Sequence, residues 1–302
     1  MSKDKSVQYS QEYTASVGCT DTGDKDLYIT CIRSLPTKEI IAGSVKLSSS
    51  YMPSLSPIMP FVPTIDYRDA GVNDLPLQSI KDGKSMAEFG VPLMLGSNQD
   101  EGSMFVPGLP LMVPEFHYPL TRISDVKLTV HHILDPVLGA TVVTQHVDEL
   151  LTYYDQTLPQ DKMMMILRDY IFLCPSRRAA RAVEATRKAE SFMYHFEYKN
   201  LWADVIAMGD YHGVEIYFLF DTSFPSNLVH PFLIGENAMV KEVQGYWVGL
   251  AEGQVPKYEG GVNWPAYSKD GGEYMELNWP SVAKTNLNGA VCDYHDKILN
   301  LY

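Results

Sequence analysis

Two short apolar segments in the middle of the chain predict buried β-strands. Residues 91–96 hold five consecutive non-polar residues closed by a glycine, and residues 191–198 alternate aromatic and polar side chains. A short apolar run bounded by turn residues is typical of a fully buried strand, and aromatic enrichment favours strands as well. We therefore expect both segments to be strands running into loops.

Helical patterns lie between and after these strands. Residues 120–173 have helix-like periodicity that we expect to stop at Cys174-Pro175, and residues 177–190 are rich in Ala, Arg and Glu. Apolar stripes at helical spacing follow in residues 239–250 and 287–301. The first 60 residues are polar and broken by Gly and Pro, and they suggest a surface excursion with one helical pattern near residues 27–32. Helices between buried strands indicate an α/β fold class. The predicted common face of the 120–173 segment comprises Met164, Leu167, Tyr170 and Ile171.

The composition is that of a globular protein and narrows the classes of partner. Hydrophobic residues make up 45% and charged residues 20%, and no linker or repeat divides the 302 residues, so we expect one unit. A formal charge of −13 argues against nucleic-acid or anionic-membrane partners. No segment is apolar over the length of a membrane span, and the first residues lack the apolar core of a signal peptide.

Four cysteines are present, an even number that permits two disulfides by three connectivities. No pair has the Cys-x-x-Cys spacing of a zinc site. The adjacent His131 and His132 also lack a nearby Cys or a pair of carboxylates. We therefore expect neither a metal nor a cofactor, and the cysteines are either disulfides or buried thiols.

An acid and a base follow the two predicted strands. Glu101 lies five residues beyond Gly96, and His212 lies 111 residues further along (212 − 101) on a loop after the second strand. Reactive residues of α/β sheets sit on loops beyond the carboxyl ends of the strands. A carboxylate that accepts the Nδ1 proton of a histidine orients the ring, so that Nε2 can take a proton from a serine. The acid precedes the base, as in α/β-hydrolases.

Five motifs in order resemble those of the type-B carboxylesterases and cholinesterases. The segment 96–105 resembles the acid segment of that family, Gly-x-Asn-x-x-Glu-Gly followed by an aromatic residue, and residues 212–215 resemble its His-Gly-x-Glu segment. Residues 61–66 resemble its Phe-x-Pro-x-x-Asp segment, Cys174-Pro175 its Cys-Pro at a helix end, and residues 263–265 its late Trp-Pro. The resemblance covers residues from about 15 to 302 and implies the C-terminal part of an α/β-hydrolase, with a mostly parallel but incomplete central sheet flanked by helices.

The resemblance also implies a role for each matching residue. Glu101 corresponds to the triad acid, His212 to the general base and Phe105 to an aromatic residue of the acyl pocket. Met104 stands where cholinesterases place an aromatic residue against the choline head group, so one cation–π contact is lost. Pro57 and Met59 stand where acetylcholine-type enzymes have bulky phenylalanines. A general carboxylesterase that acts on a small carboxylic ester is therefore favoured over a cholinesterase.

The family pattern pairs the cysteines and suggests a compartment. Cys19 with Cys31 matches its small-loop disulfide, and Cys174 with Cys292 its long-loop disulfide. Two disulfides imply an oxidising compartment, so we expect a secreted or lumenal protein whose signal peptide lies upstream of these residues. The chain has no Asn-x-Ser/Thr glycosylation site, unlike many secreted members. Homo-oligomerisation stays open.

The nucleophile of a triad is absent from these residues. No Gly-x-Ser-x-Gly occurs, and the nearest match at Ser85 lacks the second glycine, while Ser103 and Ser176 have no such setting. The Gly-Gly pairs at 260–261 and 271–272 are not placed like an oxyanion loop. We therefore expect a fragment, or an incomplete gene product, of a serine carboxylesterase that is inactive alone. The alternative is a non-catalytic, cholinesterase-like adhesion protein, which would have no need of Glu101 and His212.

Overall fold

A computed structural model describes most of the chain, namely residues 2–51, 62–65, 67, 72–84, 90–112, 115–116, 118–156, 158–198, 207–222, 234–253 and 255–299. The chain divides into two compact units. Unit 1 comprises residues 1–76, 109–117 and 128–143, and unit 2 comprises residues 77–108, 118–127 and 144–302. Each unit is described by itself below. The expectation of one partial domain over residues 1–302 stays a prediction.

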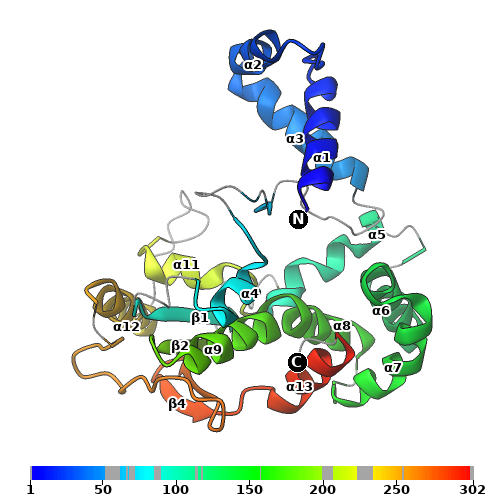
Figure 1. Ribbon diagram of the computed structural model, residues 1–302. Coiled ribbons are helices and arrows are strands. Elements are labelled where there is room, and N and C mark those ends of the chain that lie inside the picture. Colours follow the sequence, from blue (N-terminus) through cyan, green and yellow to red (C-terminus); the bar gives the residue numbers. More distant parts are fainter. Residues whose placement is uncertain are drawn as a thin grey trace. The chain divides into compact units, whose positions relative to one another are not determined.

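Unit 1 begins with three helices, α1 (Lys3–Ser16), α2 (Lys25–Ser34) and α3 (Thr37–Tyr51), shown in blue in Figure 1. The expected helical pattern near residues 27–32 lies within α2, whereas α1 and α3 were not predicted from the sequence. Local capping explains the difference, because the Ser2 hydroxyl accepts the Lys5 N–H and the Asp24 carboxylate accepts two N–H groups at the start of α2. The Cys19–Cys31 disulfide then closes the α1–α2 loop.

Unit 2 is built on a four-stranded sheet in the order β1-β2-β3-β4. β1 (Leu93–Asn98), β2 (Ser191–Phe196) and β3 (Glu273–Leu277) are parallel, and β4 (Val282–Thr285) is antiparallel to β3. The two predicted strands are confirmed, with β1 shifted by two residues toward the C-terminus. The register aligns Asn98 with Phe196, so that β1 and β2 end at the same edge of the sheet. The mostly parallel sheet flanked by helices confirms the α/β fold class.

Helices cover both faces of this sheet. On one face, Phe192, Phe196 and Met275 pack with Phe218 of α11 (Val214–Leu219) and with α12 (Ile234–Ala251). On the other face, Met193 packs with α9 (Cys174–Thr186) and α13 (Gly289–Ile298). Figure 1 shows α9 beside β1 and β2. Alternate residues of β2 therefore face two separate cores, as the period of two along a strand requires.

The remaining elements are α4 (Pro76–Lys81), η3 (Glu101–Met104), η4 (Val106–Gly108), α5 (Leu109–Met112), α6 (Ile123–Leu138), α7 (Ala140–Thr152), α8 (Pro159–Leu167) and η5 (Arg168–Leu173).

The helical chain from α8 to α9 contains a π-helix, η5, and does not stop at Cys174-Pro175. Pro175 is tolerated because it lies in the first turn of α9, where its missing N–H costs nothing. The π-helix also makes the predicted common face wrong beyond Leu167. Its i→i+5 bonding admits an additional residue, so that Arg168 and Asp169 turn inward while Ile171 stays 37% exposed.

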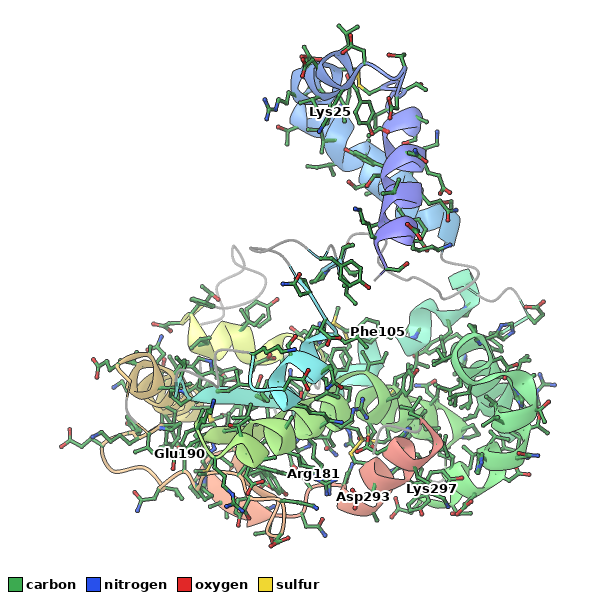
Figure 2. All side chains as sticks on the ribbon, in the orientation of Figure 1. Lys25, Phe105, Arg181, Glu190, Asp293 and Lys297 are labelled. Carbon is green, nitrogen blue, oxygen red and sulfur yellow. A yellow bond between two sulfur atoms is a disulfide. The ribbon has the colours of Figure 1, made fainter. Side chains whose placement is uncertain are left out.

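Covalent and ionic contacts join α9 to α13. The Cys174–Cys292 disulfide spans 118 positions of the sequence. Asp293 accepts hydrogen bonds from Arg177 at 2.7 Å and from Arg181 at 2.8 Å, and Figure 2 labels Arg181 and Asp293 in this region. Burial opposes ionisation of Asp293, but the two guanidinium groups prevail and lower its pKa. The two helices are thus cross-linked on the same face of the sheet.

Candidate active site

The loop after β1 carries the predicted acid. β1 ends at Asn98, and the 3-10 helix η3 begins at Glu101, which is 4% exposed. The Asn98 N–H donates to Oε1 of Glu101 at 2.8 Å and so folds the carboxylate back toward the strand end. Gly102 is required next, because a Cβ there would lie 2.2 Å from the Met164 carbonyl oxygen of α8. This close approach presses the loop, referred to below as the acid loop (residues 97–102), against α8.

The segment with the predicted base, residues 209–215, is joined to the acid loop by backbone and side-chain bonds. Asp100 and Asp210 bond twice, since the Asp100 N–H donates to the Asp210 carbonyl at 3.1 Å and the Asp210 N–H to the Asp100 carboxylate at 3.0 Å. The Asn98 side-chain amide donates to the Tyr211 carbonyl at 2.9 Å and to Glu215. We call these four bonds the loop clamp. The clamp fixes the two loops relative to each other although 111 residues separate Glu101 from His212.

Glu101 and His212 meet within this clamp. Nδ1 of His212 lies 2.6 Å from Oε2 of Glu101, and because a carboxylate only accepts, Nδ1 donates. Burial raises the pKa of Glu101, while hydrogen bonds from the Asn98 amide and from His212 act in the opposite direction. The His212 side chain is 48% exposed, and its Nε2 has no hydrogen-bond partner among the described residues. The pair thus has a buried, oriented carboxylate and a half-exposed imidazole.

Two phenyl rings flank the imidazole of His212. Phe105 lies 5.6 Å away between ring centroids, and Phe172 lies 4.7 Å away. The two phenyl rings also contact each other at 5.9 Å. Phe105, which Figure 2 labels, was predicted from the sequence, whereas Phe172 of η5 was not. Its position beside His212 depends on the π-helix, and helical periodicity alone does not indicate one.

The other predicted site residues have different placements. Met104 is the last residue of η3 and is 44% exposed. Ser103 is buried at 4% exposure, and Ser176 donates to the Gly96 carbonyl at 3.4 Å, so neither hydroxyl is presented as a nucleophile. Pro57 and Met59, and also Ser85, lie outside the described residues.

The structure contains the two disulfides that the family resemblance implies, Cys19–Cys31 and Cys174–Cys292. Across the described parts of the chain, no three His, Cys, Asp or Glu side chains converge in a way that could hold a metal ion. None of the described helices is long and apolar enough to cross a membrane.

Comparison with known proteins gives one consistent family. A model of the Carboxylesterase family matches residues 1–295, a span that begins earlier than the expected start near residue 15. The Crystal protein of Dictyostelium discoideum is 25% identical over 85% of this chain and 44% of its own length. The Cholinesterase of Mus musculus is 26% identical over 86% of this chain and 42% of its own length. The chain thus spans less than half the length of these curated relatives.

Two solved structures have a similar fold. A structure of PNB esterase matches with a TM-score of 0.68 at 18% identity, and the match covers 99% of this chain and 55% of that one. A second structure of PNB esterase gives a TM-score of 0.70. These esterases have the α/β-hydrolase fold, and the four-stranded sheet described here is consistent with part of it. Since the family match covers nearly the whole sequence, this chain belongs to the carboxylesterase family.

Proposed function

We propose that this chain supplies the acid and the base of a carboxylic ester hydrolase that works through an acyl-serine intermediate. The observation that carries the proposal is the 2.6 Å hydrogen bond from Nδ1 of His212 to the buried Glu101 carboxylate. Family membership supports the reaction class. The nucleophilic serine belongs to a further part of a longer protein, because the matched relatives are more than twice as long as the aligned part of this chain.

The geometry of the pair suits general-base catalysis. With Nδ1 donating to Glu101, the lone pair of a neutral imidazole lies on Nε2, which can remove the proton of a serine hydroxyl as it attacks the ester carbonyl. The imidazolium that forms is stabilised by the adjacent carboxylate. His212 then returns the proton to the leaving alkoxide, and a water molecule activated in the same way hydrolyses the acyl-serine. In this role Glu101 orients His212 and does not itself touch the substrate.

The chain alone is proposed to be inactive. Its 302 residues contain no Gly-x-Ser-x-Gly, and Ser103 is buried beside the acid while Ser176 bonds to a strand carbonyl. Loss of the nucleophile from a serine hydrolase costs on the order of a million-fold in turnover. The intact Glu101–His212 contact favours a catalytic parent over an adhesion protein, because a binding surface gains nothing from an oriented imidazole.

The substrate is proposed to be a small, general carboxylic ester. Phe105 supplies an aromatic wall next to His212, whereas Met104 offers no aromatic face to a quaternary ammonium group. Pro57 and Met59, which stand in place of bulky phenylalanines, are proposed to leave room for other acyl groups. The two disulfides support an oxidising compartment, either the secretory pathway or the cell exterior.

A fluorophosphonate probe tests the proposal at the nucleophile. The isolated chain should remain unlabelled, while the protein encoded together with its upstream in-frame sequence should be labelled stoichiometrically at a serine outside these residues. His212→Ala in that longer protein should abolish rapid labelling. Stoichiometric labelling of the isolated chain, or an upstream stop codon without an in-frame Gly-x-Ser-x-Gly, would contradict the proposal.

A further inference from the structure

A second cluster of polar side chains centres on Gln99 of the acid loop. The Gln99 side-chain oxygen lies 2.9 Å from Nη1 of Arg168 and 2.8 Å from Nε2 of His195. The Gln99 backbone is held as well, since its N–H donates to the Phe196 carbonyl at 2.9 Å and its carbonyl accepts from Arg168 at 3.4 Å. A residue between the strand end and the triad acid is thus fixed by both β2 and η5.

The contacts of Gln99 determine the tautomer of His195. Arg168 can only donate, so the Gln99 atom that faces it is the carbonyl oxygen. That same oxygen faces Nε2 of His195, which therefore carries the proton and donates. Nδ1 is then an acceptor, and the Ser97 hydroxyl, 3.3 Å away, donates to it. Every polar atom of the ring is satisfied in one protonation state, the neutral Nε2–H form.

The surroundings of His195 hold it in this neutral form. The side chain is fully buried, and burial, together with the Arg168 guanidinium, lowers the pKa of His195 to about 3. A backbone hydrogen bond with Ser97 acts in the opposite direction, and Lys284 acts in the same direction as Arg168. Glu197 lies 3.5 Å from Nε2, on the side where the proton already resides, and the Tyr274 ring packs edge-on at 6.5 Å. His195 is thus a buried, neutral hydrogen-bond donor on a strand that is otherwise almost entirely apolar.

The Gln99 contacts bear directly on Glu101. Asn98, whose N–H holds Oε1 of Glu101, is the residue before Gln99, and Glu101 lies two residues after it. Displacement of Gln99 therefore moves both the carboxylate and the amide that holds it. Near-attack geometry tolerates only small errors, because a displacement of about 1 Å can cost about a hundred-fold in rate. The buried donor acts on the triad acid through one intervening side chain.

We propose that His195 is a positioning residue for Glu101. His195 donates from Nε2 to Gln99 and, together with Arg168, holds the acid loop in place. The inference rests on the proposed function for the role of Glu101 as triad acid. It adds a residue of β2 to the machinery that sets the acid in place. None of the five family motifs found in the sequence includes His195.

Nuclear magnetic resonance of the full chain with isotope-labelled histidine tests the proposal. Long-range proton–nitrogen correlations should show His195 as the neutral Nε2–H tautomer from pH 5 to pH 8. The Nδ1–H proton of His212, bonded to Glu101, should give a separate downfield resonance. His195→Phe keeps the ring volume but removes the donor, and this resonance should shift or be lost. His195→Gln places an amide donor at the position of Nε2 and should restore it.

Each result supports or overturns the inference. His195 as the Nδ1–H tautomer or as an imidazolium at neutral pH overturns it, as does a His195→Phe variant with an unchanged His212 resonance. A wild-type chain without the His212 resonance also overturns it, since no held Glu101 would then exist. Where His195→Phe fails to fold, Gln99→Met, a change to a half-buried loop side chain, should produce the same loss.

The proposed function is tested by a different experiment, the fluorophosphonate labelling. A longer protein that fluorophosphonate does not label overturns the proposed reaction, but it leaves the His195 tautomer and the comparison of resonances as measured. A labelled longer protein combined with an unaffected His195→Phe resonance overturns the positioning role alone.

Discussion

The loop clamp makes Gly209 and Gly213 a matched pair for mutagenesis. Both have positive φ, +57° and +86° respectively, and both lie in the segment that carries His212. A Cβ at Gly209 would lie 2.2 Å from the Asp100 carboxylate, whereas a Cβ at Gly213 would meet no atom closer than 3.8 Å, at Ile216. Alanine at either position therefore imposes the same left-handed backbone, but only Gly209→Ala collides with the clamp.

The magnitudes follow from these two contributions. A left-handed conformation of a residue with a Cβ costs about 1–2 kcal/mol, which is the expected loss for Gly213→Ala. In Gly209→Ala the Asp100 side chain must also swing away, and the buried Asp210 N–H then loses a charge-assisted acceptor. Such a bond contributes about 1.5–3 kcal/mol. Gly209→Ala should therefore cost about 2 kcal/mol more than Gly213→Ala.

Urea unfolding followed by tryptophan fluorescence measures the difference. Trp264 is buried in the core of the same unit, at 5% exposure, and reports on its unfolding. The dependence of the unfolding free energy on urea should keep its slope, because the variants change stability and not the surface exposed on unfolding. Equal losses in the two variants would refute the reasoning, since the clamp would then contribute nothing beyond backbone strain.

Three further outcomes are expected. In the longer protein, Glu101→Gln should lower kcat by about a thousand-fold or more while KM changes little, because the amide no longer selects the productive tautomer of His212. Steady-state kinetics measure this change, and a decrease in kcat of less than about ten-fold would contradict the role of Glu101. In the chain-entropy model, removal of the Cys174–Cys292 disulfide should lower the unfolding free energy by about 5 kcal/mol, and removal of the small-loop disulfide by about 3 kcal/mol. Urea unfolding of the two double serine variants measures both losses, and the reverse order would contradict the model. Because the pKa of Asp293 is lowered in the folded state, its contribution to stability is fully present above the usual carboxyl range and is lost as the pH falls through the folded pKa. Asp293→Asn should therefore make the unfolding free energy less dependent on pH at acidic pH. An unchanged dependence would argue against the ion pairs.

The sequence predicted the elements whose chemistry is local. The apolar run before Gly96 and the aromatic alternation from residue 191 identified β1 and β2, and short motifs identified Glu101 and His212. β3 was missed because its five residues include two glutamates, one of which, Glu276, is buried and forms an ion pair with Lys284 on β4. A residue of this kind looks exposed until its partner is known.

The contacts that assemble the site were not predictable from local patterns. Asn98 reaches Tyr211 and Glu215 across more than 110 positions. Asn98 and Glu215 belong to two of the motifs found in the sequence, but neither motif indicates that these two side chains bond to each other. Phe172 requires the change from α to π geometry, and His195 looks like one polar residue of an alternating strand. In each case the partner is determined by tertiary packing, which overrides the periodicity of the single element.

The π-helix η5 has a consequence for how the protein tolerates changes in length. α8, η5 and α9 form one continuous helical chain, and η5 accommodates one residue more than regular α-helix would. Deletion of a single residue from η5 would therefore convert it to α-helix and leave α9 in the same orientation relative to α8. Deletion of a residue from α8 would instead turn the positions that follow by about 100°. Phe172 would then leave His212, and Cys174 would point away from Cys292. A single-residue deletion should therefore be tolerated better in η5 than in α8.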